Sequence, residues 1–216
     1  MDKNTLIARY PRLYHMAELG GYPSIVENGL LSTVATLDRF EVRGAERFRL
    51  ESAHRPEKVT LESQAHGKVV LRDQKPMPAK RLAGMLENGL TPRQWYESIN
   101  SKVFFWVQSK RLEGLLNARS YRADEHDVLT INTASFLKAY EHSVWLCHMN
   151  SGNTFPFPVL RGTDTFKRIG DYPVNSKGSP MKEVVELVVD YSVPDIADHV
   201  IEVRRMKGSQ VLKVLR

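Results

Sequence analysis

The chain has 216 residues, of which 42% are hydrophobic and 26% are charged, and this composition excludes an intrinsically disordered protein. No apolar run reaches the roughly 20 residues that a membrane-spanning helix needs, and residues 1–10 lack the apolar core of a secretory signal. We therefore expect a cytoplasmic protein with no membrane partner, and the single cysteine, Cys147, excludes a disulfide framework or a thiolate-rich metal site within one chain.

The net charge of +6 is concentrated at the two ends of the chain. Residues 1–12 hold three basic and one acidic residue, and residues 200–216 hold five basic and one acidic residue, whereas residues 13–199 are balanced. Basic ends could attract nucleic acid or another polyanion, although a net charge of this size is also compatible with solubility alone.

The first third of the chain predicts short strands and helices. Residues 12–17 predict a strand, and residues 23–28 predict a short helix that ends at Gly29, a residue suited to a left-handed C-terminal turn. Apolar residues at helical spacing indicate a further helix over residues 31–40. Residues 58–71 favour a hairpin of two strands that turns at Gly67 and is inserted into the domain.

Two helices and a buried strand follow. Residues 78–88 predict a helix, and a Thr-Pro pair at residues 91–92 is typical of the start of another. Residues 103–107 are five consecutive apolar residues rich in strand formers, which predicts a buried strand. A helix over residues 109–116 is expected to begin with Ser109 as its cap.

Strands dominate the second half of the chain, with one helix expected over residues 133–140. A loop of fourteen residues, 150–163, exceeds the usual connection, and loops this long are often functional. No linker or repeat divides the chain, so we expect one α+β domain over residues 1–216. The strands are expected at residues 128–132, 144–149, 165–169, 184–191, 200–206 and 211–215.

A strand that carries a histidine precedes a short helix and a Gly-Leu pair. Tyr14 and His15 lie in the strand segment LYHMA, and the helical segment PSIVENGLLS ends at Ser32. This order resembles the opening of the ADP-ribosyltransferase fold of the diphtheria-toxin type, which includes poly(ADP-ribose) polymerases and the DarT family of DNA-modifying toxins. The resemblance implies that His15, Tyr14 and Ser32 bind NAD. Taken alone, His15 is better explained as a polar residue at a strand end that bonds to the backbone.

A second segment, KVFFW at residues 102–106, resembles the aromatic strand of the same enzymes, in which a ring stacks on nicotinamide. Phe or Trp stands here in place of the usual Tyr. Strand alternation puts Phe104 and Trp106 on one face and Phe105 on the other. We favour Phe104 over Trp106 as the stacking residue, and the alternative is that all three rings fill the core.

A third segment places an acidic residue inside an apolar strand. Glu186 lies in EVVELVVDY and is followed by Val-Pro-Asp-Ile at residues 193–196. A carboxylate in such a strand is costly unless its face opens onto a cleft or a partner. Glu186 resembles the catalytic glutamate of DarT-type transferases. Glu183 is the competing assignment, and a carboxylate on a water-facing edge strand is the other explanation.

Two further segments carry polar side chains suited to a binding site. Asn150 and Ser151 combine small size with hydrogen-bonding groups, and the guanidinium of Arg161 in the same loop suits a phosphate. Arg72 ends a predicted strand just before prolines, where side chains often point into a cleft. We expect these residues to line a pyrophosphate or acceptor site.

Together, the three segments imply an ADP-ribosyltransferase-like fold of mixed sheets, short helices and a long active-site loop. They imply transfer of ADP-ribose from NAD to a nucleic-acid base with release of nicotinamide, with Glu186 and His15 as catalytic residues and Glu186 stabilising positive charge on the ribose. The seven histidines show no ligand spacing, so no metal is expected.

Two alternatives to this activity stay open. One is an enzyme similar to the RNA 2′-phosphotransferases, which share the fold and use NAD. The other is a non-catalytic module of the same fold that binds NAD or nucleic acid. Across its length the chain also resembles a bacterial family with Val-Phe-Phe-Trp and Asn-Ser-Gly segments, which indicates no acceptor.

Overall fold

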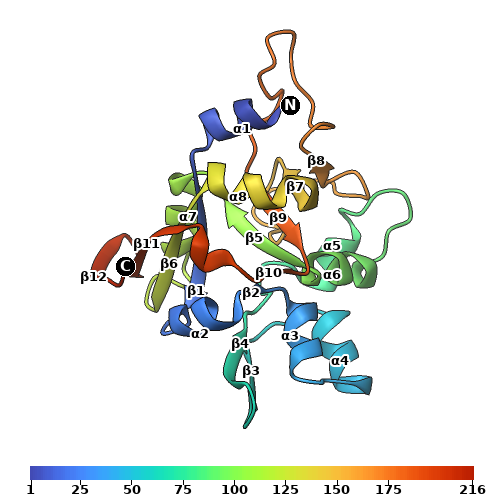
Figure 1. Ribbon diagram of the computed structural model, residues 1–216. Helices are drawn as coiled ribbons and strands as arrows, with labels where there is room; N and C mark the ends of the chain where they lie inside the picture. The colour runs from blue at the N-terminus through green and yellow to red at the C-terminus, as the bar shows by residue number, and fades with distance from the viewer.

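The computed structural model describes residues 1–216, and antiparallel strands form its centre (Figure 1). Every pair of named strands is antiparallel, and short helices pack on both faces of the main sheet, so the predicted α+β class is confirmed. The eight strands of this sheet are, in spatial order, β12 (Gln210–Val214), β11 (Val200–Lys207), β6 (Glu125–Asn132), β1 (Arg12–Glu18), β5 (Lys102–Trp106), β9 (Glu186–Asp190), β7 (Val144–Cys147) and β8 (Lys167–Arg168).

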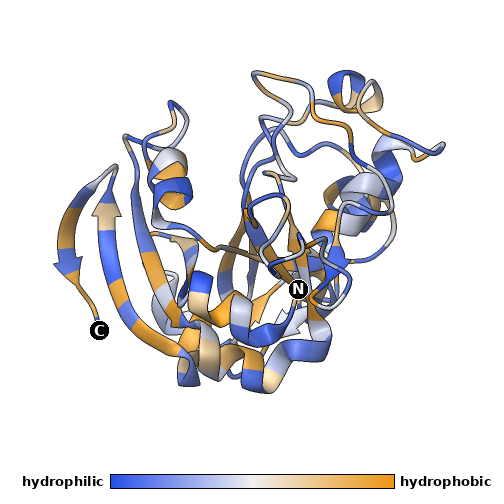
Figure 2. Cartoon of the chain, turned by 90° about the horizontal axis from the view of Figure 1, so that it is seen from above, coloured by the Kyte–Doolittle hydropathy of each residue, from blue (hydrophilic) through white to orange (hydrophobic).

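Eight α-helices connect and cover these strands. None of them is long and apolar enough to cross a lipid bilayer. Figure 2 shows hydrophobic and hydrophilic residues mixed along the strands at the C-terminal end of the sheet, where β11 is partly buried and β12 is exposed. The helices are α1 (Lys3–Arg9), α2 (Tyr22–Asn28), α3 (Thr33–Arg39), α4 (Gly44–Glu51), α5 (Ala79–Ala83), α6 (Pro92–Asn100), α7 (Ser109–Leu116) and α8 (Thr133–Tyr140).

One face of the sheet carries the main hydrophobic core. Leu13, Phe105 and Leu187 lie on this face, and they pack into the largest hydrophobic cluster with Leu6 of α1 and Phe136 of α8. Phe105 is 1% exposed, so its predicted position on the core face is confirmed. This cluster supplies most of the apolar burial that holds the fold together.

The opposite face is covered by two separate clusters. Trp95 of α6 packs over β9 and β7, with Phe104 at the edge of its cluster. Leu112 of α7 packs over β1 and β6, with Trp106 at the edge of that second cluster. The strip of sheet between the two clusters carries both half-buried aromatic rings, and the cleft described below opens over this strip.

A small second sheet joins the first predicted motif to the third. Strand β2 (Leu30–Leu31) pairs with β10 (Ser192–Val193). Gly29, with φ +77°, ends α2 as predicted, and a Cβ atom on it would lie 2.5 Å from the Cα of Pro194. The Gly-Leu and Val-Pro segments, which lie far apart in the sequence, are therefore in direct contact.

The predicted hairpin is confirmed as β3 (Val59–Ser63) and β4 (Gly67–Leu71). It lies beside α3 and α4 in Figure 1, and Leu71 forms a small core with Leu37 and Leu50 of those helices. Helix α4 falls in a charged segment for which the sequence predicts no element, and α1 was not predicted either.

Several predicted boundaries are wrong. The helix expected over residues 78–88 ends at Ala83, because Gly84 caps it and Leu86 leaves to bridge Arg161 in the long loop. Helix α7 has Gln108 at its N-cap, and Ser109 makes no capping hydrogen bond. The strand expected over residues 165–169 shortens to Lys167–Arg168.

Candidate functional site

A cleft of about 1370 Å³ opens where the two clusters on the second face leave the sheet uncovered. It draws its lining from all three sequence motifs, the β3–β4 hairpin, α7 and the start of the long loop. Nine of the predicted site residues line it, and one does not, Arg161. The nine are Tyr14, His15, Ser32, Arg72, Phe104, Trp106, Asn150, Ser151 and Glu186.

Three of these residues lie in one row across adjacent strands. Tyr14 of β1 is opposite Trp106 of β5, and Trp106 is opposite Glu186 of β9. Directly opposed residues in antiparallel strands point to the same face, with Cβ atoms about 5 Å apart. The row therefore places the rings of Tyr14 and Trp106 beside the carboxyl group of Glu186, on the strip of sheet under the cleft.

Strands β1 and β5 pair at a single position, and His15 lies where they separate. Its Nδ1 atom is 2.9 Å from the carbonyl oxygen of Phe104. Burial lowers the pKa of His15 to about 4, and the positive charge of Arg72 acts in the same direction. At pH 7 the ring is therefore neutral, with its proton on Nδ1 because a carbonyl can only accept, and Nε2 is left as an acceptor without a protein partner.

Glu186 is the most chemically constrained carboxyl group of the cleft. Its side chain is 4% exposed, and the backbone N–H of Ser151 donates to it from 3.2 Å to each of its oxygens. Burial raises the pKa of Glu186 to about 7, while the bonds from Ser151 and the charge of Arg161 act in the opposite direction. The competing residue Glu183 also lines the cleft, but it is exposed and bonds to Gln108.

Phe104 and Trp106 both line the cleft and are both half-buried, as strand alternation predicts. Phe104 contacts Phe166 at 6.5 Å between ring centroids, and Trp106 packs beside Tyr14 and Leu115. The geometry therefore leaves both rings available as stacking surfaces.

Arg161 is a correction to the predicted site. Its side chain is 1% exposed, and its guanidinium donates to the carbonyl oxygens of Ser151, Asn153 and Val159 at 2.9, 3.0 and 3.2 Å. The Arg161 guanidinium, which was predicted to bind phosphate, is therefore bonded to carbonyl groups inside the protein. The polar character of the loop gave no indication that this arginine turns inward.

The other predicted residues contact the cleft in different ways. Ser32 is buried, and its hydroxyl caps α3 by accepting from the N–H of Ala35 at 3.1 Å. Arg72 donates to the carbonyl of Met16 at 3.2 Å, and its guanidinium lies 4.8 Å from the centre of the Tyr121 ring. These contacts hold both side chains in place at the wall of the cleft.

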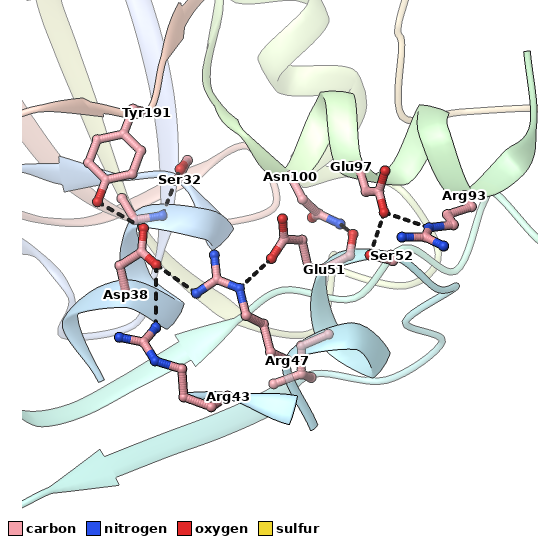
Figure 3. A network of polar contacts seen from close by, with 12 residues as sticks. Ser32, Asp38, Arg43, Arg47, Glu51, Ser52, Arg93, Glu97, Asn100 and Tyr191 are labelled. Carbon is pink, nitrogen blue, oxygen red and sulfur yellow. Dashed lines mark hydrogen bonds and ion pairs between the residues drawn. The ribbon is translucent and has the colours of Figure 1, made fainter. Parts of the chain in front are cut away.

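The far end of the Glu186 strand is anchored by a polar network (Figure 3). Tyr191, which follows β9 with φ +67°, donates from its hydroxyl to Asp38 at 3.0 Å. Arg47 bonds to Asp38 at 2.6 Å and to Glu51 at 2.8 Å, and it lowers the pKa of Asp38. The network fixes α3 and α4 against the end of β9, and so supports the strand that presents Glu186.

The sequence analysis did not identify two basic side chains of the cleft, one lysine and one arginine. Lys110 and Arg111 are exposed on α7, line the cleft and form no ion pair. The sequence predicts that these two residues lie on the solvent face of the helix, because Leu112 and Leu116 form its buried face. It does not predict that the solvent face lies beside the cleft. No group of three or more His, Cys, Asp or Glu side chains is placed to hold a metal ion.

A protein-family model described as "Family of unknown function (DUF7002)" matches residues 11–200. The chain belongs to this family. No curated protein and no solved structure matches it.

The DUF7002 match contains the whole cleft, because every residue that lines the cleft lies between Tyr14 and Glu186. Helix α1 and strand β12 lie outside the matched range. The cleft is thus a feature of the part of the chain that defines its membership of the DUF7002 family.

Proposed function

We propose that the protein is an NAD-dependent ADP-ribosyltransferase that modifies a nucleic-acid base. The proposal is carried by one observation: His15, the aromatic pair Phe104 and Trp106, and Glu186, which the sequence resemblance singled out separately, line one cleft on adjacent strands. A buried free thiol, Cys147, is compatible with the reducing cytoplasm.

Glu186 is the proposed catalytic carboxylate. Cleavage of the bond between the ribose C1′ and the nicotinamide nitrogen sends the electron pair to nicotinamide and leaves positive charge on the ribose. Because the nicotinamide ring of NAD is already cationic, cleavage moves the positive charge from the ring to the ribose, where an adjacent carboxylate stabilises it more than in the ground state. The acceptor atom then bonds to C1′ and loses a proton, for which a carboxylate with a pKa of about 7 is a suitable base.

His15 is the proposed ribose-binding residue. Its neutral ring has a fixed orientation, because Nδ1 is held by the Phe104 carbonyl. The free Nε2 accepts a hydrogen bond from a hydroxyl group without introducing a positive charge beside the ribose. The neutral state therefore suits a site in which positive charge develops during the reaction.

The charge of the cleft supports a polyanionic acceptor. Seven basic side chains line it against four acidic ones, and Lys110 and Arg111 are exposed and unpaired on its α7 wall. Phosphate groups bind such surfaces. We therefore place the nucleic-acid acceptor along α7.

The test uses purified protein incubated with NAD labelled on the adenine side, with DNA, RNA and protein offered separately. We expect labelled ADP-ribose on a nucleic acid together with released nicotinamide. Glu186→Gln should abolish both while the thermal unfolding curve shows an intact fold, and Glu183→Gln, which tests the competing carboxylate, should retain both. Full transfer by folded Glu186→Gln would contradict the assignment.

The remaining outcomes separate the alternatives. NAD binding without nicotinamide release would indicate a non-catalytic module. Loss of a 2′-phosphate from RNA, with no label retained on that RNA, would indicate the phosphotransferase activity. Label on protein alone would retain the reaction and overturn the nucleic-acid acceptor.

A further inference from the structure

The long loop reaches Glu186 through one residue, Ser151. The N–H of Ser151 lies 3.2 Å from both carboxyl oxygens, and no side chain forms an ion pair with this carboxyl group. The carboxylate therefore depends on how firmly the loop holds residue 151.

Arg161 holds Ser151 in place. Two of its nitrogen atoms bond to the carbonyls of Ser151 and Asn153, and a third bonds to Val159. Its own backbone is fixed by the N–H donated to Met85 at 2.9 Å and by the carbonyl that accepts from Glu87 at 3.0 Å. The guanidinium is thus a rigid brace across the base of the loop.

Arg161 is also an unpaired buried cation. It has no carboxylate within ion-pair distance, and Glu186 is the acidic side chain whose charge acts on it. The other titratable group against Glu186 is the Cys147 thiol, opposite it in β7, and burial raises the pKa of that thiol so that it stays uncharged. Arg161 is therefore the positive charge that Glu186 experiences.

We propose that Arg161 is a positioning residue for Glu186: its buried guanidinium fixes the Ser151 N–H against the carboxylate and supplies the compensating positive charge. The inference rests on the proposed function, since it assigns a residue that prepares the proposed catalytic group. Arg161 itself touches no substrate, because it does not line the cleft.

The test measures the carboxyl pKa of Glu186 directly, by NMR titration of protein labelled with carbon-13 at glutamate carboxyl groups. The signal is assigned by its absence from Glu186→Gln. In Arg161→Met we expect the pKa of Glu186 to rise by about one unit, because a charge and a fixed donor are lost together. Where transferase activity is measured, kcat at pH 7 should fall about fivefold with an unchanged KM for NAD, because the ionised fraction of Glu186 falls from about one half to about one tenth.

Arg81→Met is the matched control. Arg81 braces the same loop by bonding to the carbonyls of Thr154 and Pro156 at 2.7 and 3.0 Å, but it does not contact Ser151. It should leave the pKa of Glu186 unchanged. An equal rise in Arg81→Met would show that general loosening of the loop is responsible, and would overturn the specific role of Arg161.

Arg161→Lys covers the case in which Arg161→Met does not fold. It keeps the charge, but an ammonium group does not reproduce the planar fork, so we expect a rise of about half a unit. No rise in any folded Arg161 variant overturns the inference. The titration needs neither NAD nor acceptor, so its result stands even if the transferase activity is absent.

Discussion

His15 donates from Nδ1 to the carbonyl oxygen of Phe104, 2.9 Å away, at the point where β1 and β5 separate. A carbonyl at the start of such a gap has lost its partner in the strand ladder, and the imidazole replaces it. The same bond fixes the orientation of the ring and leaves Nε2 free. The His15 side chain therefore bonds to the Phe104 carbonyl through Nδ1 and keeps Nε2 as an unbonded acceptor.

Replacement of His15 by Ala should weaken NAD binding by about tenfold, the equivalent of one hydrogen bond. It should also lower the free energy of unfolding by roughly 1 kcal/mol, because the Phe104 carbonyl loses its donor. Calorimetric titration with NAD and urea unfolding measure the two effects. His142→Ala, on an exposed histidine outside the cleft, is the control. Unchanged NAD affinity in His15→Ala would remove His15 from the binding site.

Phe104→Ala should weaken NAD binding more than Trp106→Ala does. The Phe104 carbonyl holds His15, so the ring of Phe104 and the proposed ribose contact share one point on β5. Loss of a stacking ring costs about 1–3 kcal/mol, or roughly 5- to 150-fold in affinity. Phe104→Tyr keeps an aromatic surface and should retain binding. The reverse order of the two alanine variants would make Trp106 the stacking residue.

Much of the fold could be predicted from local sequence patterns. The alternation of Phe104, Phe105 and Trp106, the stop at Gly29 and the start of α6 all follow from stereochemistry within a few residues. The Thr-Pro start of α6 has a complete capping box, in which the side chains of Thr91 and Gln94 each accept a hydrogen bond from the other residue's backbone N–H.

The parts that could not be predicted depend on contacts between distant segments. Helix 78–88 stops early because Leu86 pairs with Arg161, about seventy-five positions later in the chain. The Arg161 side chain turns inward because its guanidinium bonds to three carbonyls of the loop, and a single sequence gives no sign of either contact. The cleft itself exists because the clusters around Trp95 and Leu112 do not meet, which no local pattern specifies.

The pH dependence of stability should identify Glu186. Its pKa is raised by burial to about 7 from an ordinary value of 4.5, so the folded state keeps a proton that the unfolded chain releases. The contribution of Glu186 to the free energy of unfolding is therefore fully present below pH 4.5 and is lost as the pH rises through 7. The loss is on the order of 3 kcal/mol, from about 1.4 kcal/mol per unit.

His15 acts in the opposite direction, because its pKa is lowered to about 4 and its contribution is lost as the pH falls below 6.5. The two effects oppose each other in the wild-type protein, so the measurement is a difference. Glu186→Gln retains His15, and its stability relative to wild type should rise by roughly 3 kcal/mol between pH 4 and pH 8 in urea unfolding. Glu183→Gln should show no such trend, and a constant difference for Glu186→Gln would contradict the burial of an ionisable carboxyl group.

Gly29 should be the position in the first motif that least tolerates a side chain. Its φ of +77° disfavours any other residue, and a Cβ atom would lie 2.5 Å from the Cα of Pro194 and 2.6 Å from the carbonyl oxygen of Val193. Both contacts are with backbone, so the β2–β10 pair must shift. Gly29→Ala should therefore cost roughly 3 kcal/mol or more, which lowers the melting temperature by about 10 °C.

Gly20→Ala separates the two causes. Gly20 has nearly the same φ, +76°, but nothing lies within 4 Å of the position that its Cβ would take. The backbone conformation alone should cost about 1–2 kcal/mol there. The difference between the two variants in thermal unfolding measures the overlap with Val193 and Pro194. Equal melting temperatures would mean that the Gly-Leu and Val-Pro segments are not packed together, and the cleft that depends on their contact would lose one wall.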